Sequence, residues 1–239
     1  MTLTNQRAVI FGGTSGIGLA TAKALVDAGA DVVIASRQSE KVANALKVLE
    51  HNATGEAVDA TSAEQVRAFF QHIGPFDHLI ITLSSSLGAG ELRTLDTAVL
   101  RRAFDGKFWA HLTVAQASLD TLRPDGSLTL VTAASARGPV PGASGLGAVN
   151  GALEAMIPSW AAELQPLRVN AVSPGVIATP WWDNLSQEQR EALWAQYAAQ
   201  LPVKRIGQPE DVAQTILFLI NNAFITGSVI DCNGGSFIK

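Results

Sequence analysis

The chain has 239 residues, which suits one α/β domain and allows a substantial buried core. Apolar residues make up 47% of it and charged residues 16%, a balance typical of a compact globule and not of a disordered chain. The formal net charge of −4 comes without any basic cluster, which argues against nucleic acid as the main partner. No apolar run is long enough to span a membrane, so we expect no membrane partner.

Cysteine and histidine usage narrows the chemistry further. Cys232 is the single cysteine, which excludes an internal disulfide and a thiolate metal cluster and favours a reducing, cytoplasmic compartment. Residues 1–6 are polar and lead directly into an apolar run, so we expect no secretory signal. We expect no metal site, because metal-ligand spacing is absent among His51, His72, His78 and His111.

Short apolar, β-branched runs alternate with segments of helical composition along the whole chain. Strands are expected at residues 8–11, 31–35, 54–58, 78–82, 126–132, 168–172 and 228–232. Helices are expected at residues 19–28, 40–51, 63–73, 95–122, 149–164, 186–201 (amphipathic) and 210–220. Ser62 should cap the third helix, with Gln65 placed for a capping box. The long helical region at 95–122 should break near residues 96–100.

Strands and helices that alternate with short connections predict a parallel sheet with right-handed crossovers and helices on both faces. We therefore expect a single doubly wound, Rossmann-like α/β domain over residues 1–239. Ligands of such sheets bind at the carboxyl ends of the strands, near the point where the strand order reverses. The turns expected to line one crevice follow Phe11, Ala35, Val58, Thr82, Thr132 and Val172.

Residues 9–18 form the most informative stretch, an apolar strand followed at once by a glycine-rich turn and a helix start. Glycine permits positive φ angles and lets the backbone approach a ligand closely. The free N–H groups and the dipole of a helix N-terminus favour a phosphate there. A glycine cluster alone often only makes a turn, but the flanking strand and helix favour a dinucleotide site. The cofactor-binding residues expected here are Gly12, Thr14, Ser15, Gly16, Ile17 and Gly18.

These motifs and others further along resemble those of the short-chain dehydrogenase/reductase family over nearly the whole chain. The turn at residues 12–18 is similar to that family's cofactor loop, with Phe11 where threonine is usual. Its carboxyl-terminal pattern is matched by residues 205–207, 209–213, 226–227 and 234–235. The resemblance implies that Asp59 lies beside the adenine amine. Residues 168–175 with Thr179 match the family's segment around the nicotinamide amide, which assigns Pro174, Gly175, Ile177 and Thr179 to the cofactor.

The end of the second predicted strand bears on the choice of cofactor. An acidic residue there would bond the ribose 2′-hydroxyl of NAD and repel the 2′-phosphate of NADP. Ser36 stands in that place, so the repulsion is absent, and Arg37 follows with a guanidinium that suits a phosphate. Alternatively, Arg37 only caps a surface loop. We expect NADP(H) as the cofactor.

The catalytic pattern departs from the family, whose set is Asn, Ser and a Tyr-x-x-x-Lys helix. The resemblance puts Leu146 in the tyrosine place and Asn150 in the lysine place, with Ser135 as the serine and Asp105 where asparagine is usual. The loss does not depend on the alignment, because the only tyrosine is Tyr197 and no lysine lies between residues 107 and 204. The family's usual proton donor is therefore absent.

Hydride transfer remains possible without that donor, since a positioned acid contributes about 10²–10⁴-fold and proximity contributes more. Asp105 would stabilise a cationic substrate or act as an acid, unless it only serves a helix kink. Ser135 would donate to an oxyanion or orient a water. Lys107 and Arg137 are charged candidates near the same crevice, or simply solvated charges. Asp105 and Lys107 are two residues apart on a helix and therefore point to different faces.

Two tryptophans bear on the substrate site. Trp181 and Trp182 follow the turn at residues 174–175, in the family's variable lid, where they would form an aromatic wall for an apolar or cationic substrate. Alternatively, they are lid packing. Trp109 is expected in the core. With Leu146, the tryptophan pair makes up the expected substrate contacts.

The favoured hypothesis is an NADP(H)-dependent oxidoreductase that transfers hydride to or from a small-molecule carbonyl or imine, with a non-standard proton source. One alternative is a catalytically silent nucleotide-binding homologue, such as a redox sensor or scaffold. Another is a lyase or cyclase that retains the nucleotide. The resemblance also implies a homotetramer or homodimer, through helices at residues 100–122 and 149–164.

Overall fold

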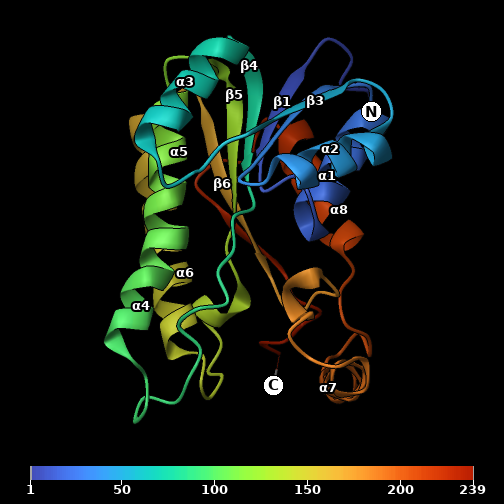
Figure 1. Ribbon diagram of the computed structural model, residues 1–239, viewed down its shortest axis with the longest axis vertical. Coiled ribbons are helices and arrows are strands. Elements are labelled where there is room, and N and C mark those ends of the chain that lie inside the picture. Colours follow the sequence, from blue (N-terminus) through green and yellow to red (C-terminus); the bar gives the residue numbers. More distant parts are fainter. Residues whose placement is uncertain (1, 239) are drawn as a thin grey trace.

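The computed structural model describes residues 2–238 and contains one seven-stranded sheet with all strands parallel. The strands are β1 (Arg7–Phe11), β2 (Asp31–Ser36), β3 (Ala53–Ala57), β4 (Phe76–Ile81), β5 (Leu122–Val131), β6 (Arg168–Pro174) and β7 (Val229–Cys232). Their order in the sheet is β3-β2-β1-β4-β5-β6-β7. From β1 the chain adds strands toward one edge as far as β3, and it then crosses to β4 and adds strands toward the other edge (Figure 1). The expected Rossmann-like, doubly wound α/β domain is confirmed.

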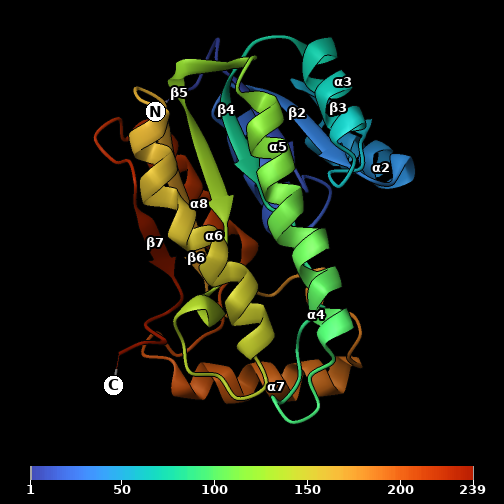
Figure 2. The same ribbon diagram turned by 90° about the vertical axis from the view of Figure 1, so that its left-hand side faces the viewer.

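Helices cover both faces of the sheet (Figure 1). They are α1 (Gly16–Asp27), α2 (Ser39–Leu49), α3 (Ala63–Ile73), α4 (Thr97–Ala103), α5 (Ala110–Ser118), α6 (Ser144–Glu163), α7 (Gln187–Gln200) and α8 (Pro209–Asn221). Helices α3, α5 and α6 pack on one face and α1, α2 and α8 on the other. Helix α7 lies across the lower end of the molecule, below the carboxyl ends of the strands (Figure 2).

The central strands alternate their side chains between two cores. On β1, Val9 and Phe11 pack with α3 and α5, whereas Ala8 and Ile10 pack with α1 and α8. All four side chains are at most 1% exposed. Each large one contributes roughly 1.5–3 kcal/mol by leaving water. Burial on both faces explains why the strands read as continuous apolar runs, and it leaves the chemistry to the loops.

The helical region expected at residues 95–122 differs from the prediction. Asp96 caps the start of α4 by accepting a hydrogen bond from the Ala98 N–H (2.7 Å), so the break expected near 96–100 is wrong. The irregularity is instead a π-helical segment, Phe104–Trp109, between α4 and α5. The helix then ends at Ser118, because Leu122 already belongs to β5. A π segment inside a longer helix often marks a functional site.

Two glycines explain why α6 begins five residues before the predicted start at 149. A Cβ on Gly145 would lie 2.3 Å from the Gly88 carbonyl oxygen, and a Cβ on Gly147 would lie 2.6 Å from that of Ser135. Glycine disfavours helix, so composition predicts a later start. Close backbone contacts override this preference and press the first turns of α6 against the loop that follows β5.

Two smaller expectations also fail. The capping box at α3 is only half formed, because the Gln65 side chain accepts from the Asp59 N–H (3.0 Å) and not from Ser62. The other half is present, as Ser62 Oγ accepts from the Gln65 N–H (3.3 Å). Trp109 is 51% exposed, because the π segment turns it outward, and so it is not a core residue.

Neither a membrane span nor a metal cluster is found in the part of the chain that the structure describes. No helix within residues 2–238 is both long and apolar enough to cross a membrane. The same residues contain no group of three or more histidine, cysteine, aspartate or glutamate side chains that could hold a metal ion.

His78, on β4, is a buried polar residue inside the sheet. Its Nδ1 lies 2.8 Å from Ser127 Oγ on β5 and its Nε2 lies 2.8 Å from Gln6 Oε1. Burial lowers the pKa of His78 from 6.5 to about 4, so the folded protein keeps the ring neutral where the unfolded chain binds a proton. Its contribution to stability is complete above pH 6.5 and is lost as the pH falls to 4.

We predict that in His78→Gln the free energy of unfolding depends less on pH between 6.5 and 4. The native imidazole should cost the folded state about 3 kcal/mol between pH 6.5 and 4, and glutamine does not titrate. Urea unfolding across this range should therefore show a shallower loss for the variant, although it is less stable at neutral pH. His51→Gln, at an exposed histidine, is the control. An unchanged slope in His78→Gln would contradict the prediction.

Candidate active site

The glycine-rich turn between β1 and α1 folds tightly back on itself. Gly12 and Gly16 have φ angles of +90° and +50°, in the region that favours glycine. A Cβ on Gly18 would lie 2.1 Å from the Gly12 carbonyl oxygen and 2.6 Å from Thr82 Oγ1. Side chains at these positions would fill the space beside the first turn of α1, so the sequence expectation of a bare backbone cradle fits the geometry.

The N-terminus of α1 is free to receive an anion. Ser15 is the N-cap residue, but its side chain makes no capping hydrogen bond, and the first turn contains no acidic residue. Ile17 is half-buried in that turn. Uncapped N–H groups and the positive end of the helix dipole point to the same place. These residues therefore fit the pyrophosphate of a dinucleotide.

The end of β2 lies beside this turn, as expected. Thr14 Oγ1 donates to Ser36 Oγ (3.2 Å), which joins the glycine-rich turn to the last residue of β2. Arg37 is exposed and makes no hydrogen bond or ion pair with residues 2–238. Its guanidinium is thus not occupied in capping a loop and is available to a phosphate.

Asp59, after β3, has a carboxylate held by its own turn. Its Oδ1 accepts from the N–H (2.9 Å) and the hydroxyl (2.8 Å) of Thr61. These hydrogen bonds, with a smaller contribution from the Arg37 charge, lower the pKa of Asp59 below its usual value. The carboxylate is therefore ionised at neutral pH and able to accept a hydrogen bond from an amine.

The segment after β6 crosses the glycine-rich turn. A Cβ on Gly16 would lie 3.2 Å from the Thr179 side chain, so the two residues are in contact. Pro174 ends β6, and Gly175 packs on Asn233, where a Cβ would come within 2.9 Å of the Asn233 Cα. Ile177 pairs with Gly207 in an isolated bridge. The structure thus brings this segment and the turn expected to bind the cofactor to one edge of the sheet.

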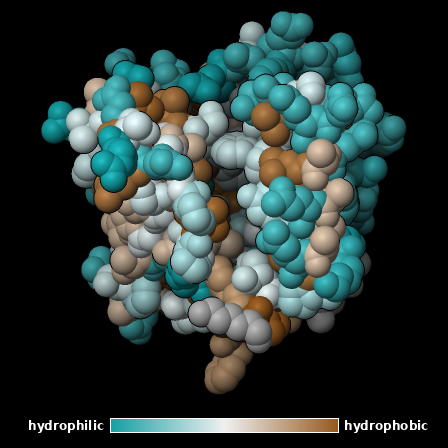
Figure 3. Space-filling view, turned by 90° about the horizontal axis from the view of Figure 1, so that it is seen from below, coloured by the Kyte–Doolittle hydropathy of each residue, from teal (hydrophilic) through white to brown (hydrophobic). Residues whose placement is uncertain are grey.

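The carboxyl ends of the strands face the lower side of the molecule. Figure 3 looks onto that side and shows a hollow near its middle, bordered by both hydrophilic and hydrophobic side chains. The expected crevice therefore lies at the edge of the sheet where the loops meet.

The structure brings together three of the expected site residues. Ser135 lies in a short 3₁₀ turn, Ala134–Ala136, and Asn150 lies on α6 and is 4% exposed. Asn150 Nδ2 donates to the Leu146 carbonyl (2.8 Å) and to Ser135 Oγ (3.4 Å). Because Ser135 Oγ accepts this bond, its own proton is free to point elsewhere.

Asp105 and Lys107 occupy opposite environments on the π segment. Asp105 is exposed and forms no hydrogen bond or ion pair within residues 2–238. Lys107 is 6% exposed, and its Nζ donates to the Thr132 carbonyl at the end of β5 (3.4 Å). Burial lowers the pKa of Lys107 from 10.5 to about 8, although Glu154 acts in the opposite direction. The alternative of a solvated charge is wrong for Lys107.

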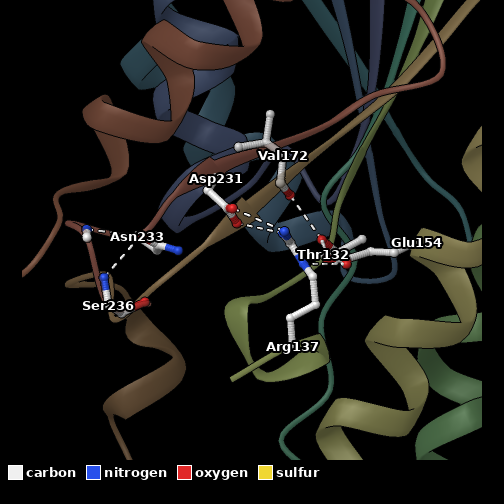
Figure 4. Close-up of polar contacts among 8 residues, drawn as sticks. Thr132, Arg137, Glu154, Val172, Asp231, Asn233 and Ser236 are labelled. Carbon is white, nitrogen blue, oxygen red and sulfur yellow. Dashed lines mark hydrogen bonds and ion pairs between the residues drawn. The ribbon is translucent and has the colours of Figure 1, made fainter. Parts of the chain in front are cut away.

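Arg137 is exposed, with 40% of its side chain open to solvent, and it joins three elements through ion pairs (Figure 4). Its Nε lies 3.0 Å from Glu154 Oε2 on α6, and its two terminal nitrogens contact the carboxylate of Asp231 on β7 at 3.1 and 2.5 Å. Thr132 Oγ1 donates to the other oxygen of Glu154 (2.8 Å). A polar network thus runs from the end of β5 to the end of β7.

The tryptophan pair lies beside Thr179 in a 3₁₀ turn, Pro180–Trp182. The two indole rings are 4.6 Å apart between centroids and meet edge to face at 77°. Trp182 Nε1 donates to the Ile177 carbonyl (2.9 Å), which holds one ring in place. Both rings are half-buried, as a wall or a packed lid requires.

Sequence reasoning did not assign Thr132, Glu154 and Asp231 to the site. One signal was available for Glu154, which lies four residues after Asn150 and therefore on the same face of α6. Thr132 and Asp231 stand near the ends of predicted strands, where side chains reach the crevice. Nothing in the sequence pairs Arg137 with residues 17 and 94 positions away.

Comparison with known proteins agrees with this geometry. A family model described as enoyl-(acyl carrier protein) reductase matches residues 12–236. The short-chain dehydrogenase/reductase ATR9 of Stachybotrys chlorohalonatus is 31% identical over 258 residues, and the match covers 100% of this chain and 99% of that protein. The chain therefore belongs to the short-chain dehydrogenase/reductase family.

Two solved structures share the fold over almost the full length. One is a small-chain dehydrogenase in complex with NADPH, 34% identical with a TM-score of 0.88, covering 98% of this chain and 99% of that one. The other is MalC reductase/Diels-Alderase from Malbranchea aurantiaca, 26% identical with a TM-score of 0.91, covering 99% and 98%. Proteins similar to this chain are thus named as reductases and dehydrogenases.

We predict that Gly18→Ala abolishes NADPH binding, because the added Cβ would meet the Gly12 carbonyl and force the turn open. Binding is measured by fluorescence titration and folding by circular dichroism. Gly106→Ala is the control, since a Cβ there meets nothing within 4 Å. If Gly18→Ala is folded and still binds NADPH like the parent, the turn does not hold the phosphates.

Proposed function

We propose that this protein is an NADP(H)-dependent oxidoreductase that transfers hydride between the nucleotide and a small-molecule carbonyl or imine. One observation carries the proposal. A buried lysine, Lys107, donates to the Thr132 carbonyl at the end of β5, at the same edge of the sheet as the glycine-rich turn, and Ser135, which is bonded to Asn150, follows β5 three residues later. A buried, perturbed titratable group at such an edge is typical of an active site.

The chain's own residues would hold the nucleotide. The turn at residues 12–18 and the N-terminus of α1 fit the pyrophosphate, and Asp59 fits the adenine amine. The resemblance assigns residues 174–179, which contact that turn through Thr179, to the nicotinamide. When bound, the nucleotide supplies the hydride. Ser36 and the unoccupied Arg37 favour a 2′-phosphate, and the similar dehydrogenase solved with NADPH supports this choice.

Lys107 takes the place of the missing tyrosine as the proton source in this proposal. An ammonium group with a pKa of about 8 is protonated at neutral pH and close enough to neutrality to release its proton. Reduction of a ketone consumes one hydride and one proton, which Lys107 provides to the developing alkoxide. Ser135, held by Asn150, donates a hydrogen bond to the same oxygen.

The lid residues favour an apolar or cationic substrate. Trp181 and Trp182 offer aromatic faces and edges beside the cofactor segment, and Leu146 adds an apolar side chain at the start of α6. An N-alkyl iminium ion already carries its positive charge, so hydride alone converts it to the amine. Such a substrate needs no proton from the protein.

A second candidate function is cyclisation with the nucleotide retained. The observation in its favour is the fold shared with MalC, named as both a reductase and a Diels-Alderase. A cycloaddition transfers no proton, so the absence of tyrosine does not weigh against it. Substrate turnover without oxidation of NADPH would select this candidate, and nucleotide binding without any turnover would select a silent homologue.

Self-association is also part of the proposal. Trp109, at the start of α5, is 51% exposed, and aromatic side chains are enriched in interfaces between subunits. This supports the homotetramer or homodimer expected from the resemblance.

We predict that Ser36→Asp combined with Arg37→Ala reverses the cofactor preference. The variant removes the cation and adds a carboxylate that repels the 2′-phosphate, so affinity for NADPH should fall by at least about tenfold while NADH is retained or gained. Dissociation constants for both nucleotides are compared by fluorescence titration. Arg205→Ala is the control for loss of an arginine. Unchanged NADPH affinity would contradict the role of both residues.

We predict that Lys107→Met separates ketones from iminium ions. Reduction of a cyclic ketone should lose about 10²–10⁴-fold in kcat/KM, because the proton source is gone. Reduction of an N-alkyl iminium ion should be nearly unchanged, as should NADPH affinity. Consumption of NADPH is followed by absorbance over a panel of both substrate types, with Lys47→Met at an exposed lysine as control. Equal losses for both types would refute Lys107 as the proton source.

A further inference from the structure

Glu154 is a nearly buried carboxylate placed between two cations. Its side chain is 9% exposed. Its Oε1 accepts from Thr132 Oγ1 (2.8 Å), and its Oε2 pairs with Arg137 Nε (3.0 Å). The carbonyl of the same Thr132 accepts from Lys107 Nζ. Thr132 therefore ties Lys107 and Glu154 to one residue at the end of β5.

Arg137 is shared between Glu154 and a second carboxylate. Its two terminal nitrogens donate hydrogen bonds to the two carboxylate oxygens of Asp231, at 3.1 and 2.5 Å, and its Nε forms an ion pair with Glu154 (Figure 4). The guanidinium also lies 5.6 Å from the ring centroid of Phe237, in the carboxyl-terminal tail. Arg137 is held from several sides, and its charge therefore stays beside Glu154.

Three elements pack against Lys107 with polar groups. The carbonyl of Thr132, directly after β5, accepts from its Nζ, and His111 of α5 contacts its backbone carbonyl through Nδ1 (2.8 Å). His111 carries no charge at neutral pH, because burial, followed by the Lys107 charge, lowers its pKa to about 3. Glu154 of α6 is the carboxylate that acts on Lys107, since Asp105 of the same segment is exposed.

We propose that Glu154 and Arg137 are positioning residues that set how strongly Lys107 holds its proton, Glu154 strengthening the hold and Arg137 weakening it. This inference rests on the proposed function, in which Lys107 supplies the proton. It adds the device that keeps a buried ammonium charged at neutral pH yet able to release its proton.

The physical reason lies in the balance of burial and charge. A lysine taken out of water loses its proton more easily, and an anion nearby opposes that loss. The Glu154 carboxylate is that anion, and its effect depends on how much of its charge Arg137 neutralises. Loss of Glu154 and loss of Arg137 should therefore move the titration of Lys107 in opposite directions. A purely structural role would move both variants the same way, if at all.

The test is a ¹³C NMR titration of the full-length protein labelled at lysine Cε, with the Lys107 signal assigned by its absence in Lys107→Met. In Glu154→Gln the midpoint should fall by about one pH unit, and in Arg137→Met it should rise. Arg205→Met is the matched control. Arg205 makes a similar two-pronged pair with Asp211, at 2.6 and 2.8 Å, but does not contact Glu154. In Arg205→Met the midpoint of the Lys107 titration should match that of the parent protein.

Thr132→Val is a third variant, which tests the same network if Glu154→Gln or Arg137→Met does not fold. It removes the hydroxyl that donates to Glu154 while keeping the shape of the side chain, so Glu154 acts more strongly on Lys107 and the midpoint should rise. Shifts in the same direction for Glu154→Gln and Arg137→Met, or no shift in either, overturn the inference.

The titration separates this inference from the proposed function, because it needs no substrate. If the Lys107 midpoints shift as stated, the positioning roles of Glu154 and Arg137 stand. If the pH at which the rate of ketone reduction falls then moves with the Lys107 midpoints, Lys107 also supplies the proton. If that pH stays in place while the midpoints move, the proposed proton source fails and the positioning roles remain.

Discussion

The parallel direction of all seven strands is the constraint on which the rest of this structure depends. It gathers the carboxyl end of every strand at one edge, so turns that are far apart in the chain meet there. Both faces of the central strands are buried under helices, which keeps their side chains out of reach of a ligand and leaves the chemistry to those turns. Glycines make the meeting possible, because Gly18, Gly145 and Gly147 bring backbone against backbone where any side chain would collide.

At this edge lies the ammonium group of Lys107, a charge that burial destabilises. Lys107 comes from the π segment, where the wider turn carries it inward while Asp105 stays outside. Thr132, whose carbonyl accepts from Lys107, also donates to the nearly buried Glu154, which pairs with Arg137, and Arg137 pairs in turn with Asp231. The same contacts join β5, α6 and β7, and in our proposal they serve both the shape and the chemistry of the site.

The fold and the glycine-rich turn were largely predictable, because they depend on local patterns. Apolar runs, helix starts and the glycine spacing at residues 12–18 act over a few residues each, and all seven strands were expected within a few positions of where they lie. The lysine that we propose as the proton source could not be singled out from the sequence. Asp105 and Lys107 look equivalent in sequence, and only the register of the π segment decides which one is buried. The start predicted for α6 was also too late, because composition gives no information on the contacts of Gly88 and Ser135 with its first turns.

The sequence by itself determined the doubly wound sheet and the bare glycine turn, since these follow from residue type and short spacing. The tertiary structure decided which charges lie together at the carboxyl edge of the sheet. Arg137 meets Glu154 and Asp231 across 17 and 94 residues, and a carboxylate gains its effect on Lys107 only where water is excluded between them. Electrostatic coupling of this kind depends on distance and burial, which no stretch of sequence contains.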